Sequence, residues 1–233
     1  MKKTRVGSFI FIAVLAVLLW AGHSYAHLAQ GGAAPVFSLA DAKGQKFDLS
    51  KAKDQPLTIL YFFAADSRPS QEGLLGLNDL AGRHPGAGLT VWAITLSSPD
   101  KVRQFASQTG LSFPVLLDNG KVSDLYKART VLPAVCIVGP GLKVLDYFQG
   151  GGKTTEAMLT RLAERELQRR QTKMARVIGD AVVKKNPRNV KARAVQGYAA
   201  LKDKKYAEAE KIFKDVSGMG TSGEILGKEG LAA

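Results

Sequence analysis

Two long apolar runs, each followed by a helical pattern, constrain the fold of this chain more than any other feature of its sequence. The runs are residues 57–64 and 89–96, and near-continuous apolar runs are typical of strands buried on both faces of a sheet. A helix is predicted to begin after each run, near Ser67 and near Asp100. Strands that alternate with helices predict a parallel-rich sheet with helices on both of its faces.

Shorter segments extend the predicted sheet. They are residues 36–39, 46–49, 113–117, 134–138 and 143–148. Further helices are expected at residues 122–126 and from Thr154 or Thr155. The last two strands form a hairpin around Gly139-Pro140-Gly141, which makes the sheet mixed. The predicted fold class is therefore α/β.

The first 26 residues have the order of a secretory signal peptide. Basic residues among the first five positions precede an apolar run at residues 9–21, and Ser24 and Ala26 supply small side chains before a cleavage point. The run is shorter than the roughly 20 residues that a bilayer-spanning helix needs. We therefore expect export to the periplasm or another extracytoplasmic space, with a mature chain that begins near His27. An uncleaved N-terminal membrane anchor is the alternative.

The formal net charge of +13 is concentrated in the last third of the chain. Residues 151–233 carry 18 basic and 10 acidic groups, whereas residues 27–150 carry 12 and 10. One interpretation is a solvated helical surface. The other is weak attraction of this basic surface to anionic phospholipid or to an acidic partner. Nucleic acid is not an expected partner of an exported protein.

Cysteine and histidine usage argues against metal and redox cofactors. Cys136 is the single cysteine, so no internal disulfide can form, and the three histidines lack the spacing of metal ligands. We expect no metal, no haem and no other cofactor. Cys136 lies within the apolar residues 134–138, where a free cysteine packs as a small hydrophobic side chain. A reactive thiol would need exposure and electropositive surroundings.

Residues 34–170 resemble the redoxin family, in particular its exported thioredoxin-like thiol–disulfide oxidoreductases within the alkyl hydroperoxide reductase–thiol-specific antioxidant superfamily. The resemblance rests on residues 34–39, 44–46, 60–64, 113–116 and 131–135, which occur in the family's order. It implies a thioredoxin-like mixed sheet with helices on both faces. It does not establish an activity, because one fold serves many functions.

The family's catalytic motif is replaced in this chain. A tryptophan and a Cys-x-x-Cys motif follow the strand in the family, and here Asp66 occupies the tryptophan position while Ser67 and Ser70 occupy the two cysteine positions. Disulfide exchange and peroxidase chemistry both need a thiolate. A serine hydroxyl stays protonated without an adjacent base and forms no disulfide. The resemblance therefore implies no catalytic residue at this site.

The motif region retains features that suit binding. Ser67 and Ser70 suit the start of a helix as caps, and the helix N-terminus could also offer N–H donors to a carboxylate or peptide group. Pro133 occupies the family's cis-proline position, whose loop pairs with substrate backbone, although a proline that simply begins an edge strand is the alternative. The resemblance implies a candidate binding groove formed by Asp66, Ser67, Pro69, Leu132 and Pro133.

The residues beyond Gln171 have helical patterns only. The spacing of Gly197, Tyr206, Ala209 and Phe213 resembles a tetratricopeptide repeat, and a generic helical hairpin is the alternative. Because a repeat array needs about three units to bury its core, we expect an incompletely covered apolar stripe. The polar stretch 168–173 favours one long helix that holds this segment away from the first domain, where it could contact a second protein partner.

The predicted organisation is a signal peptide at 1–26, a linker at 27–34, a thioredoxin-like domain at 35–170 and a tetratricopeptide-like helical segment at 171–233. The sequence favours a binding or scaffold protein that recognises an extended peptide or protein and is not an enzyme of the ordinary redoxin type. The alternative is a thiol–disulfide oxidoreductase or antioxidant redoxin that acts through Cys136 or through a partner's thiols.

Overall fold

A single mixed sheet forms the first part of the computed structural model, which describes residues 28–83, 86, 88–151 and 153–233. Its strands are β1 (Ser38–Asp41), β2 (Lys46–Asp48), β3 (Leu57–Phe63), β4 (Leu89–Thr95), β5 (Val115–Leu117), β6 (Ala134–Gly139) and β7 (Lys143–Gln149), in the order β2-β1-β5-β4-β3-β6-β7. β3 pairs with β4 and β4 with β5 in parallel, and the other pairs are antiparallel. The predicted mixed sheet is confirmed, whereas the signal-peptide prediction for residues 1–26 lies outside the described residues.

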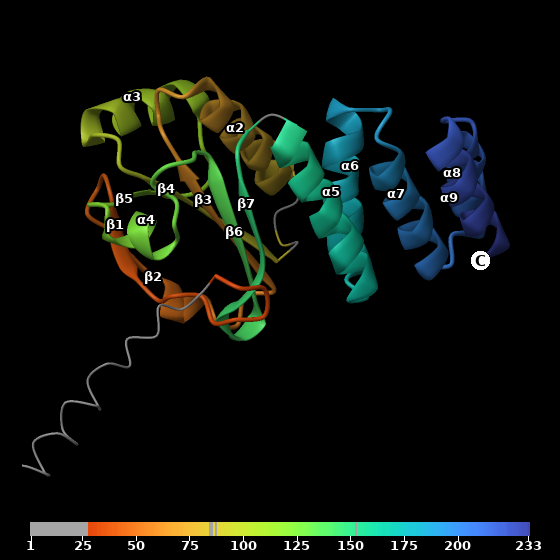
Figure 1. Ribbon diagram of the computed structural model, residues 1–233, viewed down its shortest axis with the longest axis horizontal. Helices are drawn as coiled ribbons and strands as arrows, with labels where there is room; N and C mark the ends of the chain where they lie inside the picture. Colours follow the sequence, from red (N-terminus) through yellow and green to blue (C-terminus); the bar gives the residue numbers. More distant parts are fainter. Residues whose placement is uncertain (1–27, 84–85, 87, 152) are drawn as a thin grey trace, which may run out of the picture.

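Helices cover both faces of the sheet (Figure 1). They are α2 (Arg68–Arg83), α3 (Pro99–Thr109), α4 (Lys121–Leu125) and α5 (Lys153–Gln168), with short 3-10 turns at Leu49–Ala52 and Pro140–Leu142. β3 is fully buried, and its alternate residues face opposite sides. Ile59 and Tyr61 pack with α2, α3 and α5, while Leu60 and Phe62 pack with α4 and the N-terminal segment.

Four helices follow α5 in the described chain, so the segment is longer than the predicted hairpin. They are α6 (Thr172–Lys185), α7 (Val190–Lys202), α8 (Tyr206–Ser217) and α9 (Thr221–Ala232). Each packs against the next, and α5 also packs against α7, and α7 against α9. Figure 1 shows α5 to α9 as a row of helices that extends away from the sheet. α5 therefore belongs both to the sheet domain and to the helical stack.

The expectation of a helical segment held away from the first domain is wrong for its first helix, α6. α6 packs against α2, and its side chains Met174, Val177 and Ile178 join the same apolar core as β3 and α2. The expected long helix is also absent, because Arg170 has a φ of 62° and separates α5 from α6. This turn folds α6 back along α5, so its apolar face meets the domain instead of solvent.

The apolar stripe of the C-terminal helices is covered within the chain, contrary to expectation. Val177, Ile178, Val182, Ala209 and Phe213 are all buried. α9 closes the end of the stack over Phe213, because the backbone of Gly230 touches the Phe213 ring. None of the helices in the described part of the chain has both the length and the hydropathy needed to cross a bilayer.

Candidate functional site

Ser67, the first serine of the Ser-x-x-Ser sequence, lies at the start of α2. β3 ends at Phe63, and a turn leads from there to Ser67, the residue before the helix. The Ser67 N–H donates to the Ala64 carbonyl at 3.1 Å, and the Ser67 carbonyl accepts from the Gln71 N–H at 2.9 Å. The partly exposed Ser67 thus occupies the capping position, where the helix N-terminus meets solvent.

The second serine, Ser70, is buried and hydrogen-bonded within the core. Ser70 is 0% exposed, and its Oγ accepts from the Ala64 N–H at 3.3 Å. Its carbonyl accepts from the Tyr61 hydroxyl at 3.1 Å. Because its side chain is buried and bonded, Ser70 stabilises the turn and cannot contact a ligand directly.

Asp66 forms an ion pair that no sequence pattern predicts. Lys101 of α3 donates to its Oδ2 at 2.7 Å, and both side chains are more than half exposed. This hydrogen bond lowers the pKa of Asp66 below its ordinary value. Position 66 therefore carries a charged group that is ionised at neutral pH.

Other side chains fix the turn without a disulfide. The Ala65 N–H donates to Ser97 Oγ at 3.0 Å, and Gln71 Nε2 donates to the Ala65 carbonyl at 2.6 Å. Sequence reasoning missed Ser97, Gln71 and Lys101. Ser97 and Lys101 are more than 30 positions away from their partners, and no local pattern marks such contacts.

The proline loop lies beside the start of α2. The Leu132–Pro133 peptide bond is cis, as expected, and the Pro133 carbonyl accepts from the Gly150 N–H at 2.8 Å. Gly151 separates Pro69 from Pro133: a Cβ on Gly151 would lie 2.6 Å from Pro69 Cβ and 3.3 Å from Pro133 Cδ. Only a residue without a side chain fits there, so Gly151 is a further site residue that the resemblance did not identify.

Leu132 has free backbone groups at this position. Among the described residues, neither its N–H nor its carbonyl takes part in a hydrogen bond, although its side chain is half-buried. Val131, the residue before it, is 45% exposed, and Leu96 at the end of β4 is 40% exposed. Leu96 directly follows the end of β4, which pairs with the end of β3. It therefore lies at the same edge of the sheet as residues 64–67, the motif turn between β3 and α2.

A polar hollow of about 260 Å³ adjoins the motif turn between α2 and α3. Its lining includes Asp66, Gln71, Lys101, Gln104, Phe105 and Gln108. The structure therefore combines free backbone groups, exposed apolar side chains and polar groups around the start of α2. This combination suits the recognition of a polypeptide better than it suits a small apolar ligand.

Cys136 lies in the middle of the sheet. It is 0% exposed and opposite Leu60 of β3 and Tyr147 of β7. Burial, with a smaller contribution from the charge of Asp146, raises the pKa of its thiol to about 12. The predicted burial of Cys136 is confirmed, and the thiol is protonated and enclosed at neutral pH. The described residues also contain no group of three or more side chains suited to holding a metal ion.

A mixed sheet flanked by helices, with a strand-to-helix turn beside a cis-proline loop, defines the thioredoxin-like class of proteins. The AhpC/TSA family model matches residues 30–146, and the chain belongs to this family. The redoxin resemblance is thereby confirmed at the level of family and fold.

Among its relatives is a Mycobacterium tuberculosis protein named as a peroxiredoxin, 35% identical over 92 residues, which are 39% of this chain and 58% of the relative. The thiol-disulfide oxidoreductase ResA of Halalkalibacterium halodurans is 27% identical over 140 residues, 59% of this chain and 77% of ResA. The chain thus spans less than two thirds of the mycobacterial relative's length.

Solved structures show the same fold. A protein from Chlorobium tepidum named for thiol:disulfide interchange, DsbE, has a TM-score of 0.53 and 24% identity, covering 58% of this chain and 96% of that chain. A protein from Bacteroides thetaiotaomicron named as a protein disulfide isomerase has a TM-score of 0.51 and 20% identity, covering 60% and 91%. At these identities the likeness concerns the fold alone.

Proposed function

We propose that this chain is an exported, redox-inactive member of its family that binds an extended polypeptide at the former active-site groove. The observation that carries the proposal is the unpaired backbone of Leu132 beside Pro69 and Pro133. An extended peptide can pair with a free N–H and a free carbonyl as an added strand does. Ser67 and Asp66 then lie where the helix N-terminus meets the bound chain.

The proposed absence of thiol chemistry rests on three positions. Ser67 and Ser70 supply no thiolate, and Cys136 is buried with a raised pKa, so an oxidoreductase that acts through Cys136 is disfavoured. We expect the purified protein to reduce no insulin disulfides and to consume no hydroperoxide. Activity that disappears in Cys136→Ser would restore the oxidoreductase alternative.

Export is supported by the basic, apolar and small-residue order of residues 1–26. The proposed domains are the signal peptide, the linker 27–34, the thioredoxin-like domain 35–170 and the segment 171–233. A tetratricopeptide-like character of this segment is supported by the contacts of α5 with α7 and of α7 with α9, since successive units of a repeat array pack together. In this proposal α5 is the first helix of the array.

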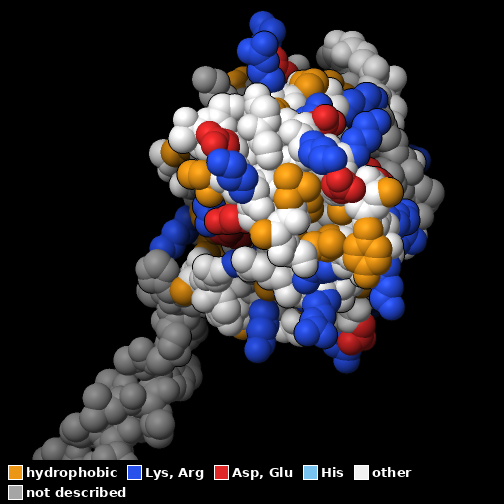
Figure 2. Space-filling view, turned by 90° about the vertical axis from the view of Figure 1, so that its right-hand side faces the viewer, with side chains coloured by type: hydrophobic (Ala, Val, Ile, Leu, Met, Phe, Trp, Pro, Cys, Tyr) orange, Lys and Arg blue, Asp and Glu red, His pale blue; other side chains and the backbone are white. Residues whose placement is uncertain are grey.

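A second protein partner could bind at the end of the helical stack. Figure 2 shows hydrophobic side chains among basic ones on this end of the molecule. Tyr206, Ile225 and Leu231 are large apolar side chains that are exposed on α8 and α9. Exposed apolar side chains of this kind are typical anchors at protein interfaces.

Site-directed photocrosslinking tests the groove. A photoreactive residue at Val131 should crosslink to a polypeptide in cells that export the protein, because Val131 is exposed next to Leu132. The matched control is Lys43, which is exposed in the β1–β2 turn. This turn lies at the opposite edge of the sheet from the groove, because β1 runs antiparallel to β5 while β3, β4 and β5 are parallel. Equal crosslinking from both positions, or none from Val131, contradicts peptide binding at the groove.

A further inference from the structure

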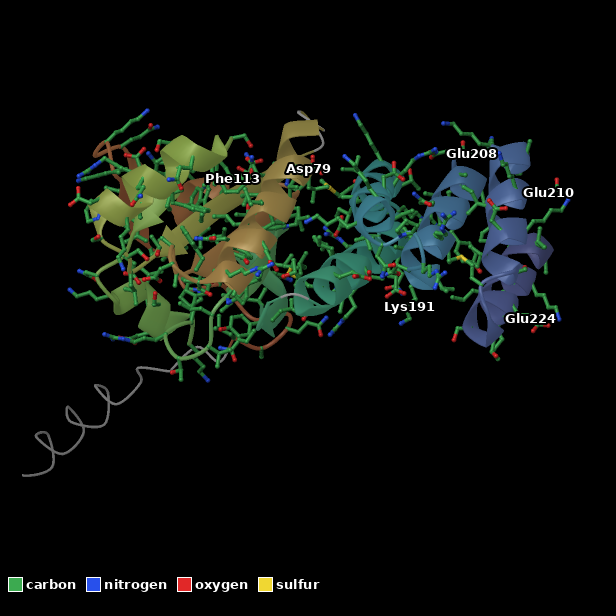
Figure 3. All side chains as sticks on the ribbon, turned by 90° about the horizontal axis from the view of Figure 1, so that it is seen from above. Asp79, Phe113, Lys191, Glu208, Glu210 and Glu224 are labelled. Carbon is green, nitrogen blue, oxygen red and sulfur yellow. The ribbon has the colours of Figure 1, made fainter. Side chains whose placement is uncertain are left out.

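The net positive charge of the helical stack lies in its first half. Residues 151–201 carry 12 basic and 4 acidic groups, a net of +8, whereas residues 202–233 carry 6 of each. Figure 3 shows Glu208, Glu210 and Glu224 at the far end of the stack, and Lys191 at the α5–α7 part. The net charge of the stack therefore belongs to α5, α6 and α7.

The first part of α5, the end of α6 and the α6–α7 turn bring basic groups together at one end of the stack. Asn186 Nδ2 and Asn189 Nδ2 both donate to Glu156 Oε1 at 2.7 Å, which ties the α6–α7 turn to the first part of α5. This turn lies at the upper end of the stack in Figure 1. We call this surface the basic end, and it consists of Arg161, Lys184, Arg188 and Lys191.

The cations of the basic end are weakly neutralised. Lys184 and Arg188 are exposed and form no ion pair with another described residue, whereas the neighbouring Lys185 ammonium lies over Gly76 of α2, in a hollow that Glu72 and Asp79 also line. Arg161 and Lys191 pair with Asp146 at 3.2 Å and with Glu164 at 3.9 Å, but they remain 59% and 65% exposed. Exposed ion pairs of this kind are weak, so all four side chains of the basic end can interact with an external anion.

A hollow of about 370 Å³ lies within the basic end. Arg161 and Lys191 line it together with Thr160, Asn186 and Asn189, so it presents two cations along with amide and hydroxyl groups. Glu156 also lines it, with Oε1 engaged by the two asparagine amides. The hollow has the polarity that a phosphate group requires.

We propose that the basic end binds the surface of an anionic phospholipid membrane. Its cations complement lipid phosphates, and clusters of basic residues are attracted to anionic leaflets. The described basic end has no large exposed apolar side chain, whereas such side chains lie at the groove and on α8–α9. Protein interfaces usually have an apolar or aromatic core, so its absence here favours a lipid surface over an acidic protein.

Vesicle sedimentation tests the proposal. The full chain should bind vesicles of equal parts phosphatidylglycerol and phosphatidylcholine more tightly than pure phosphatidylcholine vesicles, and added salt should weaken the difference. The combined variant Lys184→Ala, Arg188→Ala and Lys191→Ala should lose about a hundredfold in this preference, since each basic residue near such a surface contributes about 1 kcal/mol. The pure phosphatidylcholine arm measures any contribution of the N-terminal apolar run.

The matched control removes the same charge elsewhere. Lys202, Lys211 and Lys214 are exposed on α7 and α8, and their combined substitution by alanine should leave the preference intact. An equal loss in both variants would show attraction by net charge alone and would overturn the proposal. Binding to soluble polyglutamate without any preference for anionic vesicles would also overturn it, in favour of an acidic protein partner.

Discussion

Ser67 and Ser70 are three positions apart in one motif, yet their surroundings differ. Ser67 is partly exposed at the end of the turn, whereas Ser70 is buried against Tyr61 and Ala64. An exposed first position and an enclosed second one is the arrangement that a nucleophilic thiol and a resolving thiol would need. In the proposed loss of redox chemistry, the site would therefore differ from a catalytic one by two atoms, Oγ for Sγ.

This geometry predicts a gain of activity. In the double variant Ser67→Cys and Ser70→Cys, the first thiolate should attack a substrate disulfide, and the second should resolve the mixed disulfide and become oxidised, with dithiothreitol as reductant. Insulin reduction should rise clearly above background. The control Ser67→Ala and Ser70→Ala should stay inactive, and a double cysteine variant that folds but remains inactive would show that the groove no longer accepts a disulfide.

The raised pKa of Cys136 predicts how the stability of the fold changes with pH. Its folded-state pKa of about 12 exceeds the unfolded value of roughly 8.5, so the folded state binds the thiol proton more tightly. The stability linked to this proton is complete below that unfolded value and is lost as the pH rises toward 12. The stability advantage of the wild type over Cys136→Ala should therefore shrink across this range in denaturant titrations.

Chemical labelling of the Cys136 thiol measures its burial independently of the pH effect. At pH 8 the native protein should react slowly with an aromatic disulfide reagent, and one thiol per chain should react once denaturant is added, as Cys136 is the single cysteine. Rapid labelling of the native protein would contradict a buried Cys136.

At the scale of helices and strands, the periodicity of apolar residues predicted well which segments form helices and which form strands. It predicted poorly which of these elements pack together. β3 and β4 were predictable because each is a long apolar run, and the resemblance located the cis Pro133. The docking of α6 was not predictable, since an apolar helix face indicates that it is buried but not what covers it. The turn at Arg170 brings α6 back against the domain, and the positive φ of Arg170 cannot be inferred from a polar stretch.

The packing of α7 on α8 leads to a prediction about glycine. A Cβ on Gly197 would lie 2.7 Å from Phe213 Cε1, and Gly230 of α9 already touches the same ring. The ring has no room to move, so Gly197→Ala should destabilise the protein by about 1–3 kcal/mol, the range for overpacked cores. Thermal unfolding followed by circular dichroism measures this loss.

Gly82 provides the matched control. It lies within α2, and a Cβ on Gly82 would have no other atom within 4 Å, so Gly82→Ala should stabilise the helix by about 0.5–1 kcal/mol. Adding Phe213→Leu to Gly197→Ala should recover part of the lost stability if the ring contact is the cause. An equal effect of both glycine substitutions would contradict the close packing of α7 on Phe213.

At the scale of the whole molecule, α5 and α6 join the sheet domain to the helical stack. α5 packs on the sheet through Met158 and Leu162, and α6 covers α2 and α5 through Val177 and Ile178. The sheet domain and the stack share one apolar core, so the groove at the start of α2 and the basic end of the stack belong to one continuous body. A ligand bound at either proposed surface would therefore be held in a fixed orientation relative to the other surface.

This shared core predicts the result of a truncation after Arg170. Removing α6 to α9 would expose the apolar faces of α2 and α5 that α6 covers, and each fully buried apolar side chain contributes about 1.5–3 kcal/mol. Loss of two such contacts, about 3 kcal/mol or more, corresponds to a fall in Tm of roughly 6 °C or more for a chain of this size. A control truncation after Met219 removes only α9 and should leave the sheet domain's transition nearly unchanged, because α6 stays in place. If the shorter chain instead melts like the full protein, α6 is dispensable for the domain, and the single shared core is wrong.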